Sequence, residues 1–175
     1  HGRVGIDPDL VTIGKVMGGG IAISAVAGKA DIMKWVDDSK VTHLGTLNGN
    51  RVSTAAALAT IHELEKDNGA AFTKMEGLFE KLATGIRELF AKHQTPGVVN
   101  QVGPVMQVIF TDAKEVNDFD TFNERDAAKY AKFAEEMLKE GVMLRMNGLW
   151  YISTAHEEED IDKTLQAIDR VLPRL

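Results

Sequence analysis

The sequence lacks several features that would each point to a particular class of protein. None of its 175 residues is cysteine, which excludes disulfide bonds and thiolate metal sites and fits a reducing cytoplasm. It has no apolar run of about 18 residues, so no membrane span is expected, and no cationic-then-apolar leader for secretion. No basic block offsets the net charge of −6, which argues against a nucleic-acid partner. The apolar content of 44% and charged content of 26% are those of a soluble globular protein.

The two ends of the chain differ in what they indicate. The sequence begins at His1 without an initiator methionine, and residues 2–5 resemble the middle of a loop. We therefore expect a part of a longer protein, with part of any active site missing. Near the other end, the acidic run 157–160 is typical of a helix N-terminus, and His156 has no nucleophile or metal partner near it in sequence. Both are interpreted as structural, and no metal site is expected.

Hydrophobic periodicity predicts an alternation of strands and helices. The apolar stripe from Phe72 to Leu89 recurs at steps of three and four and predicts a core-facing helix. The loops are expected at 37–50, where Asn50 is a plausible N-cap of the next helix, and at 111–124. Strands are predicted at 10–13, 21–28, 98–110 with a break at Gly103-Pro104, 142–146 and 149–153, the last two forming a hairpin around Asn147-Gly148. Helices are predicted at 30–36, 53–65, from Asn68-Gly69 to Pro96-Gly97, at 127–140 with Gly141 as its stop, and at 157–172.

A lysine followed by a run of glycines needs a particular explanation. Lys15 lies between an apolar stretch and Gly18–Gly20, in the segment PDLVTIGKVMGGGIAISAVAG. A solvated lysine at a strand end, a phosphate-binding loop and a Schiff-base lysine are the three interpretations. The phosphate loop fails, because Val16 stands where Ser or Thr is needed and the glycines lie downstream. An amine in a site of restricted water can attack an aldehyde, and neighbouring glycines leave room for a flat cofactor.

Three segments carry a family resemblance: PDLVTIGKVMGGGIAISAVAGKADIM, GTLNGNRVSTAAALATI and YISTAHEEEDIDKTLQAID. They resemble, in this order, the lysine segment, the Gly-Thr-x-x-Gly-Asn-Pro loop with its helix, and the closing segment of class III (ω-type) aminotransferases. The order and spacing match over essentially the whole chain. The most similar subgroup comprises glutamate-1-semialdehyde aminomutases and the β-amino-acid transaminases that resemble them.

The resemblance implies a fold, a cofactor and site residues. The fold would be α/β, the fold type I of PLP-dependent transferases, with the C-terminal part of the PLP-binding large domain at 1–68 and the connecting helix and α+β small domain at 69–175. Lys15 would form the Schiff base with pyridoxal 5'-phosphate and move the proton during the reaction. Thr46 and the backbone N–H of Gly45 would bind the cofactor phosphate. In the family this loop reaches across to the neighbouring subunit, which implies a homodimer with shared active sites.

The implied reaction moves an amino group between an amino acid or amine, β-amino acids included, and a keto acid. An aminomutase, which exchanges amino and carbonyl groups within one substrate, is the alternative on the same scaffold. A non-catalytic chain that keeps the fold is the alternative of another class. The segment LRMNGLW lacks the glutamate usual in aminomutases, which favours a transaminase, and its Arg145 is a candidate for holding a substrate carboxylate.

Two further departures from the family pattern limit what the resemblance implies. Arg51 replaces the usual proline after Gly-Asn, while Gly45 and Thr46 are kept. The family's aspartate partner of the pyridinium nitrogen, its glycine-rich phosphate loop and its ring-stacking aromatic all lie upstream of the lysine, outside this sequence. Any complete active site therefore belongs to a longer parent protein.

Overall fold

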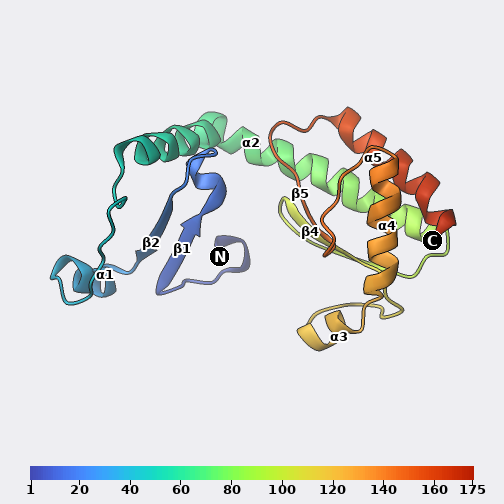
Figure 1. Ribbon diagram of the computed structural model, residues 1–175, viewed down its shortest axis with the longest axis horizontal. Helices are drawn as coiled ribbons and strands as arrows, with labels where there is room; N and C mark the ends of the chain where they lie inside the picture. The colour runs from blue at the N-terminus through green and yellow to red at the C-terminus, as the bar shows by residue number, and fades with distance from the viewer. The chain divides into compact units, whose positions relative to one another are not determined.

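Two antiparallel sheets organise the chain in the computed structural model, which describes residues 1–175 (Figure 1). One sheet belongs to the unit His1–Gly69 and the other to the unit Ala70–Leu175. The strands are β1 Leu10–Gly14, β2 Ser24–Gly28, β3 Val98–Val102, β4 Val105–Ile109 and β5 Leu149–Tyr151. The helices are α1 Ala30–Asp37, α2 Arg51–Lys92, α3 Phe119–Asn123, α4 Ala127–Lys139 and α5 Glu158–Val171, with 3-10 turns η1 Gly2–Val4, η2 Lys15–Gly18 and η3 Leu172–Arg174.

The first unit is built around the pair β1 and β2. Their register runs from Leu10 opposite Gly28 to Gly14 opposite Ser24, and the connection between them is η2 with the glycine run. The sequence predicts β1 and α1 closely. It places the start of β2 at Ile21, three residues before the observed start at Ser24.

Helix α2 consists of two helical segments separated by a break. Residues Lys66–Gly69 have non-helical backbone angles, including left-handed values at Asn68 (φ 56°) and Gly69 (φ 78°). The break occurs at the Asn-Gly pair where the sequence predicts one helix to follow another. The second segment ends at Lys92, before the predicted stop at Pro96-Gly97.

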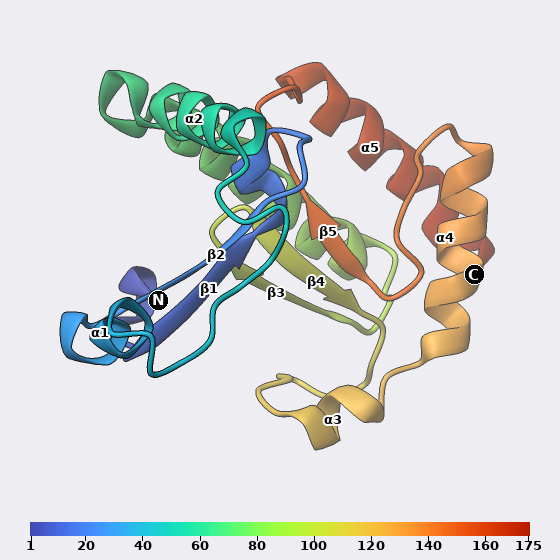
Figure 2. The same cartoon turned by 60° about the vertical axis from the view of Figure 1, so that its left-hand side comes forward.

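The second unit is a sheet covered by helices on one face. The strand order is β3-β4-β5, and Val99 lies opposite Val108 while Met106 lies opposite Trp150 (Figure 2). Because side chains alternate along a strand, these four point to the same face. All four are buried in one cluster with side chains of α2, α4 and α5. The result is a layer of helices packed on a sheet.

Aromatic side chains fill the centre of this core. Phe79, Phe110 and Phe133 are at most 1% exposed, and the rings of Phe110 and Phe133 meet edge to face at 5.4 Å. The buried Trp150 indole N–H donates to the Tyr130 hydroxyl at 2.9 Å, and burial raises the pKa of Tyr130 to about 12. The predicted stripe on α2 is confirmed from position 75 onward, whereas its first member, Phe72, is 42% exposed.

Two predictions in the second unit are wrong. Residues 142–146 are not a strand, and β5 pairs with β4, Leu149 lying opposite Gln107. The side chains of Val142 and Leu144 still pack against the core. The alternation of apolar and polar residues in this segment therefore indicates a half-buried chain that is not paired with a strand. The predicted loop 111–124 contains the short helix α3, which Asp118 caps by accepting a hydrogen bond from the Thr121 N–H at 2.7 Å.

The helices α4 and α5 agree with the sequence. Asp126 caps α4 by accepting from the Lys129 N–H at 2.8 Å, and Gly141 follows the helix with a left-handed φ of 88°. Glu157 and Asp160 form a capping box at the start of α5, which accounts for the acidic run. None of the helices combines the length and the apolar character needed to cross a membrane.

Candidate functional site

Lys15 lies where β1 ends and η2 begins. Its backbone is left-handed, with φ at 56°, although lysine has a Cβ that makes this region unfavourable. Such strain costs about 1–3 kcal/mol and tends to concentrate at functional positions. The side chain is exposed. Its amine makes no hydrogen bond or ion pair with another residue of the chain.

Three other lysines of the first unit, Lys29, Lys40 and Lys66, are paired with carboxylates. Lys29 Nζ lies 2.8 Å from Asp9, and Lys40 Nζ lies 3.3 Å from Asp38. In these pairs the carboxylate occupies the amine as a partner, which leaves Lys29 and Lys40 less available to a ligand. Lys34 is also unpaired, but it lies on α1 and does not line the cavity that Lys15 lines. Lys15 is therefore the amine of this unit best suited to covalent chemistry.

The glycines after Lys15 serve the packing of the turn. A Cβ on the buried Gly18 would lie 2.9 Å from Ile23 Cγ2. Gly19 is left-handed at φ 56°, and a Cβ there would lie 2.5 Å from Thr60 Oγ1 of α2. Gly18 and Gly19 thus allow the turn that carries Lys15 to pack closely against Ile23 and Thr60. This packing role was not foreseen from the sequence.

A cavity of about 620 Å³ lies beside Lys15 within the first unit. Its wall includes residues 21–26, which cover the end of the β1–β2 connection and the start of β2, the loop residues 47–50, and Ser53 and Thr54 near the start of α2. The volume falls within the range of roughly 300–1,000 Å³ that is typical of small-molecule sites. Hydroxyl and amide groups therefore share one cavity with a free amine.

The loop before α2 carries Gly45 and Thr46. The Gly45 carbonyl accepts from the Asn48 N–H at 3.0 Å, and a Cβ on Gly45 would lie 2.7 Å from the Asn48 Oδ1. Thr46 is exposed, and its hydroxyl has no partner within the chain. Asn50 Oδ1 accepts from the Val52 N–H at 3.0 Å, which confirms it as the N-cap of α2. Neither Gly45 nor Thr46 lines the cavity with Lys15, so one copy of the chain does not bring these three together.

Arg145 belongs to the second unit and lies outside any strand. Its guanidinium Nη1 donates to the Tyr151 hydroxyl at 3.4 Å, and its Cζ lies 5.8 Å from the centre of that ring. No carboxylate pairs with it. It lines a cavity of about 200 Å³ whose other walls include Leu144, Tyr151 and His156. His156 Nδ1 accepts the Ser153 backbone N–H at 3.1 Å, which accords with a structural role.

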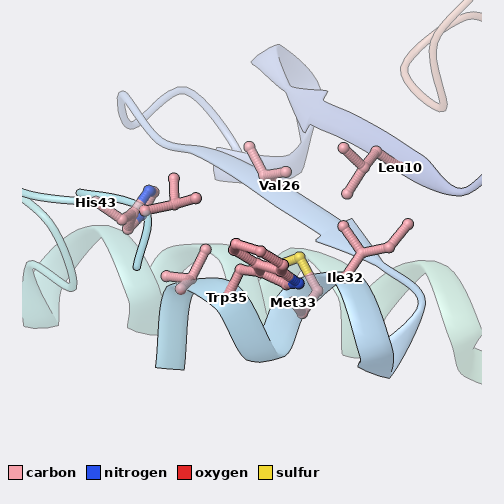
Figure 3. A pocket seen from close by; sticks show the side chains of 8 residues that line it. Leu10, Val26, Ile32, Met33, Trp35 and His43 are labelled. Carbon is pink, nitrogen blue, oxygen red and sulfur yellow. The ribbon is translucent and has the colours of Figure 1, made fainter. Parts of the chain in front are cut away.

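The first unit has a second cavity that was not predicted from the sequence. It measures about 490 Å³, and Figure 3 shows Met33 and Trp35 of α1 facing Val26 of β2 across it, with His43 at one end. Its walls are almost entirely apolar, and His43 also lines the cavity beside Lys15. The sequence predicts the helix at 30–36, but nothing in the sequence indicates a cavity beside it. The structure contains no cluster of three His, Asp or Glu side chains that could hold a metal ion.

Comparison with known proteins adds a family to this geometry. The family model described as Aminotransferase class-III matches residues 1–172. The chain belongs to the class III aminotransferase family. Its fold is accordingly α/β, the fold type I of PLP-dependent transferases, and both the fold class and the family resemblance predicted from the sequence are confirmed.

Several relatives of this class III chain have names that state an activity. It is 39% identical over 174 residues to a protein named glutamate-1-semialdehyde 2,1-aminomutase from Persephonella marina, covering 98% of this chain and 40% of the relative. It is 26% identical to a β-phenylalanine aminotransferase from Variovorax paradoxus, with a TM-score of 0.84, covering 99% of this chain and 40% of that one. A structure described as a transaminase with PLP bound is also 26% identical, with a TM-score of 0.85 and the same coverage. The chain thus spans about 40% of the length of these relatives.

Proposed function

We propose that this chain supplies the Schiff-base lysine of a pyridoxal-phosphate-dependent aminotransferase. Residues 1–68 would be the C-terminal part of the PLP-binding large domain, and 69–175 the connecting helix and small C-terminal domain. The observation that carries the proposal is the unpaired Lys15 amine beside a cavity with hydroxyl and amide groups. Family membership and a relative described as PLP-bound support it.

The cavity of about 620 Å³ is large enough for a small phosphorylated aldehyde. Lys15 provides the amine that the expected chemistry requires. Pyridoxal 5'-phosphate would supply an aldehyde and a ring that withdraws electrons from the substrate. Lys15 Nζ would attach to the aldehyde carbon with loss of water. A substrate amine would then displace Lys15 from the aldehyde carbon. The freed Lys15 amine would take a proton from the substrate carbon that bears the nitrogen and deliver it to a different atom of the reacting molecule.

Thr46 and Gly45 would hold the cofactor phosphate of a neighbouring copy. The Thr46 hydroxyl and the Gly45 N–H are donors suited to an anion, and the hydroxyl has no internal partner. Leu44 and Leu47, on either side of them, are 87% and 77% exposed. Apolar side chains this exposed are well accounted for by an interface. A homodimer in which this loop completes the partner's site accounts for both observations.

The substrates would be an amino acid or amine and a keto acid. The likeness to a β-phenylalanine aminotransferase favours β-amino acids among them, and the missing glutamate in 144–150 favours transamination. Arg145, free of carboxylate partners, would hold a substrate carboxylate. The 39% identity to a protein named as an aminomutase is the specific observation for the alternative, intramolecular amino transfer. Turnover of one substrate without an acceptor distinguishes the aminomutase from the transaminase.

The test is to locate the lysine that binds the cofactor. A protein containing residues 1–175 is incubated with pyridoxal phosphate, reduced with borohydride, digested and mapped by mass spectrometry. We expect the adduct on Lys15, its loss in Lys15→Ala, and its retention in Lys34→Ala, which removes an unpaired lysine outside the cavity. In the same protein, Thr46→Val should weaken cofactor binding, measured by absorbance titration, while the adduct stays on Lys15.

Two outcomes would contradict the proposal. An adduct on Lys29, Lys34 or Lys40 in place of Lys15 would show that the wrong amine has been assigned. Absence of any specific adduct in a protein that is folded would favour a non-catalytic chain that keeps the fold. An unchanged dissociation constant in Thr46→Val would remove the phosphate role of that residue alone.

A further inference from the structure

The turn that carries Lys15 is attached to the rest of the first unit on both sides. Before it, Gly14 ends β1 in register with Ser24 of β2. After it, Gly19 ends the 3-10 turn with a left-handed φ of 56°, and its N–H donates to the Val16 carbonyl at 3.0 Å. Figures 1 and 2 show this turn beside the first segment of α2, where Gly19 makes its contact.

Thr60 is the residue of α2 that Gly19 meets. A Cβ on Gly19 would lie 2.5 Å from Thr60 Oγ1, which is too close for atoms that are not bonded, and 3.8 Å from Thr60 Cβ. The Oγ1 atom is held in place, because it donates to the Ala56 carbonyl at 2.9 Å and a β-branched side chain has few rotamers in a helix. The glycine therefore rests against a side chain that does not easily move aside.

The same segment of α2 also contributes to the wall of the cavity beside Lys15. Thr54 lines the cavity and precedes Thr60 by six residues, which is about 9 Å along a helix. Positions three apart lie on one face of a helix, so Thr54, the buried Ala57 and Thr60 share a face. One face of α2 therefore fixes both a part of the cavity wall and the resting place of the lysine turn.

The backbone of Lys15 is strained between these two attachments. Its φ of 56° is unfavourable for a residue with a Cβ. Such a conformation persists only where the surrounding structure holds it. The strand ladder at Gly14 restrains one side of Lys15, and the contact of Gly19 with Thr60 restrains the other. Loss of the second restraint would let the backbone of Lys15 relax, and its side chain would then leave its present direction.

We propose that Gly19 and Thr60 are positioning residues that hold the Lys15 amine at the cavity. Neither residue lines the cavity, so both act through the backbone of the turn. The consequence for attachment of the cofactor rests on the function proposed above, whereas the placement of the amine does not. A misplacement of about 1 Å can slow a reaction by roughly 100-fold. The contact would therefore matter for the reactivity of Lys15 more than for the stability of the unit.

Four variants of a protein containing residues 1–175 separate this contact from backbone strain. Gly19→Ala places a Cβ against Thr60 Oγ1, and Thr60→Ala removes that oxygen. The double variant keeps alanine in the left-handed position but has no clash. Gly5→Ala is the control for strain alone, because Gly5 has a φ of 67° and a Cβ there would meet nothing within 4 Å.

The position of the amine is measured without cofactor. The lysines are methylated with ¹³C-formaldehyde and a mild reductant, and the NMR signal of Lys15 is identified by its loss in Lys15→Arg. We expect this signal to move in Gly19→Ala and to return in the double variant. The Lys34 signal should stay in place throughout, and Gly5→Ala should move neither signal.

A second variant covers the case in which Gly19→Ala does not fold. Thr60→Ile presses on the turn from the side of the helix and should also move the Lys15 signal. A Lys15 signal that stays in place in every folded variant, or that does not return in the double variant, would overturn the proposal.

Pyridoxal phosphate then tests the consequence for the cofactor. The adduct on Lys15, trapped with borohydride and compared with that on Lys34, should form about tenfold more slowly in Gly19→Ala and recover in the double variant. Equal rates in Gly19→Ala and the parent would refute this consequence. Absence of a specific Lys15 adduct in the parent would refute the proposed function instead, and the NMR signals would still decide whether Gly19 and Thr60 position the amine.

Discussion

At the scale of single residues, Lys15 and Arg145 each lack a carboxylate partner and also line a cavity, of about 620 Å³ and about 200 Å³. Many lysines and arginines of this chain are in surface ion pairs, such as Lys92 with Asp169 at 2.7 Å and Arg170 with Glu140 at 2.8 Å. Lys15 and Arg145 make no ion pair, and each lines a cavity. An exposed ion pair stabilises a fold by only about 0–1 kcal/mol. Leaving these two cations unpaired therefore costs the fold little and keeps them available to a ligand.

Arg145 gives a prediction about substrate selection. In a protein containing this chain, Arg145→Ala should lower kcat/KM for an amino-acid substrate by about 1.5–3 kcal/mol, the range for a lost hydrogen bond to a charged group. The same change should leave an amine without a carboxylate nearly unaffected. Arg125→Ala is the control, because Arg125 also lies over an aromatic ring, that of Phe122, in the same unit. Equal losses on both substrates would reduce Arg145 to a structural residue.

At the scale of elements, the sequence was sufficient to predict features that depend on residues close together in the chain. It was not sufficient to predict which strands pair or which distant segments meet. Lys15 was singled out as a candidate because a lysine beside a glycine run is visible in one short segment, and its role remains a proposal. Residues 142–146 have the alternation of apolar and polar side chains that is typical of a strand, but no local pattern indicated that β5 pairs with β4 instead. The cavity wall near Lys15 was missed for the same reason, since residues 21–26 and 47–50 meet only in three dimensions. The short helix at 119–123 was missed although its N-cap, Asp118, is in the sequence.

The N-cap of α4 gives a prediction at this scale. Asp126 accepts a hydrogen bond from the Lys129 N–H at 2.8 Å, which satisfies one of the donors that a helix start leaves free. Asp126→Ala should lower the free energy of unfolding by about 1 kcal/mol, measured by urea denaturation, while Asp126→Asn keeps the acceptor and should cost less. Asp120→Ala serves as a control, because that exposed carboxylate makes no cap bond. Equal losses for Ala and Asn would show that the cap bond is not the cause.

At the scale of the whole molecule, the two units differ in how much apolar surface they bury by themselves. Among the buried apolar side chains, Ala57 alone belongs to the first unit, and the rest belong to the second. The first unit also exposes Leu44, Leu47 and Trp35 to 87%, 77% and 55%. The second unit therefore holds the stabilising core, while the first has apolar surface available for the dimer proposed above.

The second unit also determines how stability should depend on pH. Hydrogen bonds from Arg170 and Arg174 lower the pKa of Glu140 below its usual 4.5. Hydrogen bonds from Lys92 and, to a smaller extent, from His93 lower the pKa of Asp169 below its usual 3.8. A carboxylate whose pKa is lower in the folded state binds protons more readily when unfolded. Its contribution is therefore complete above the unfolded pKa and is lost as pH falls through the folded one.

Acid unfolding followed by near-ultraviolet circular dichroism, to which the buried Trp150 contributes, measures this dependence. The free energy of unfolding should decline as pH falls below 4.5, the ordinary pKa of glutamate. Glu140→Gln should be less stable at neutral pH and should flatten that decline, because it removes one of the carboxylates that must be protonated. Glu135→Gln, in α4, which Glu140 directly follows, lacks an ion-pair partner and should leave both the neutral stability and the slope unchanged. Parallel acid limbs for Glu140→Gln and the parent would mean that the contacts of Glu140 with Arg170 and Arg174 do not contribute to the acid stability of the folded chain.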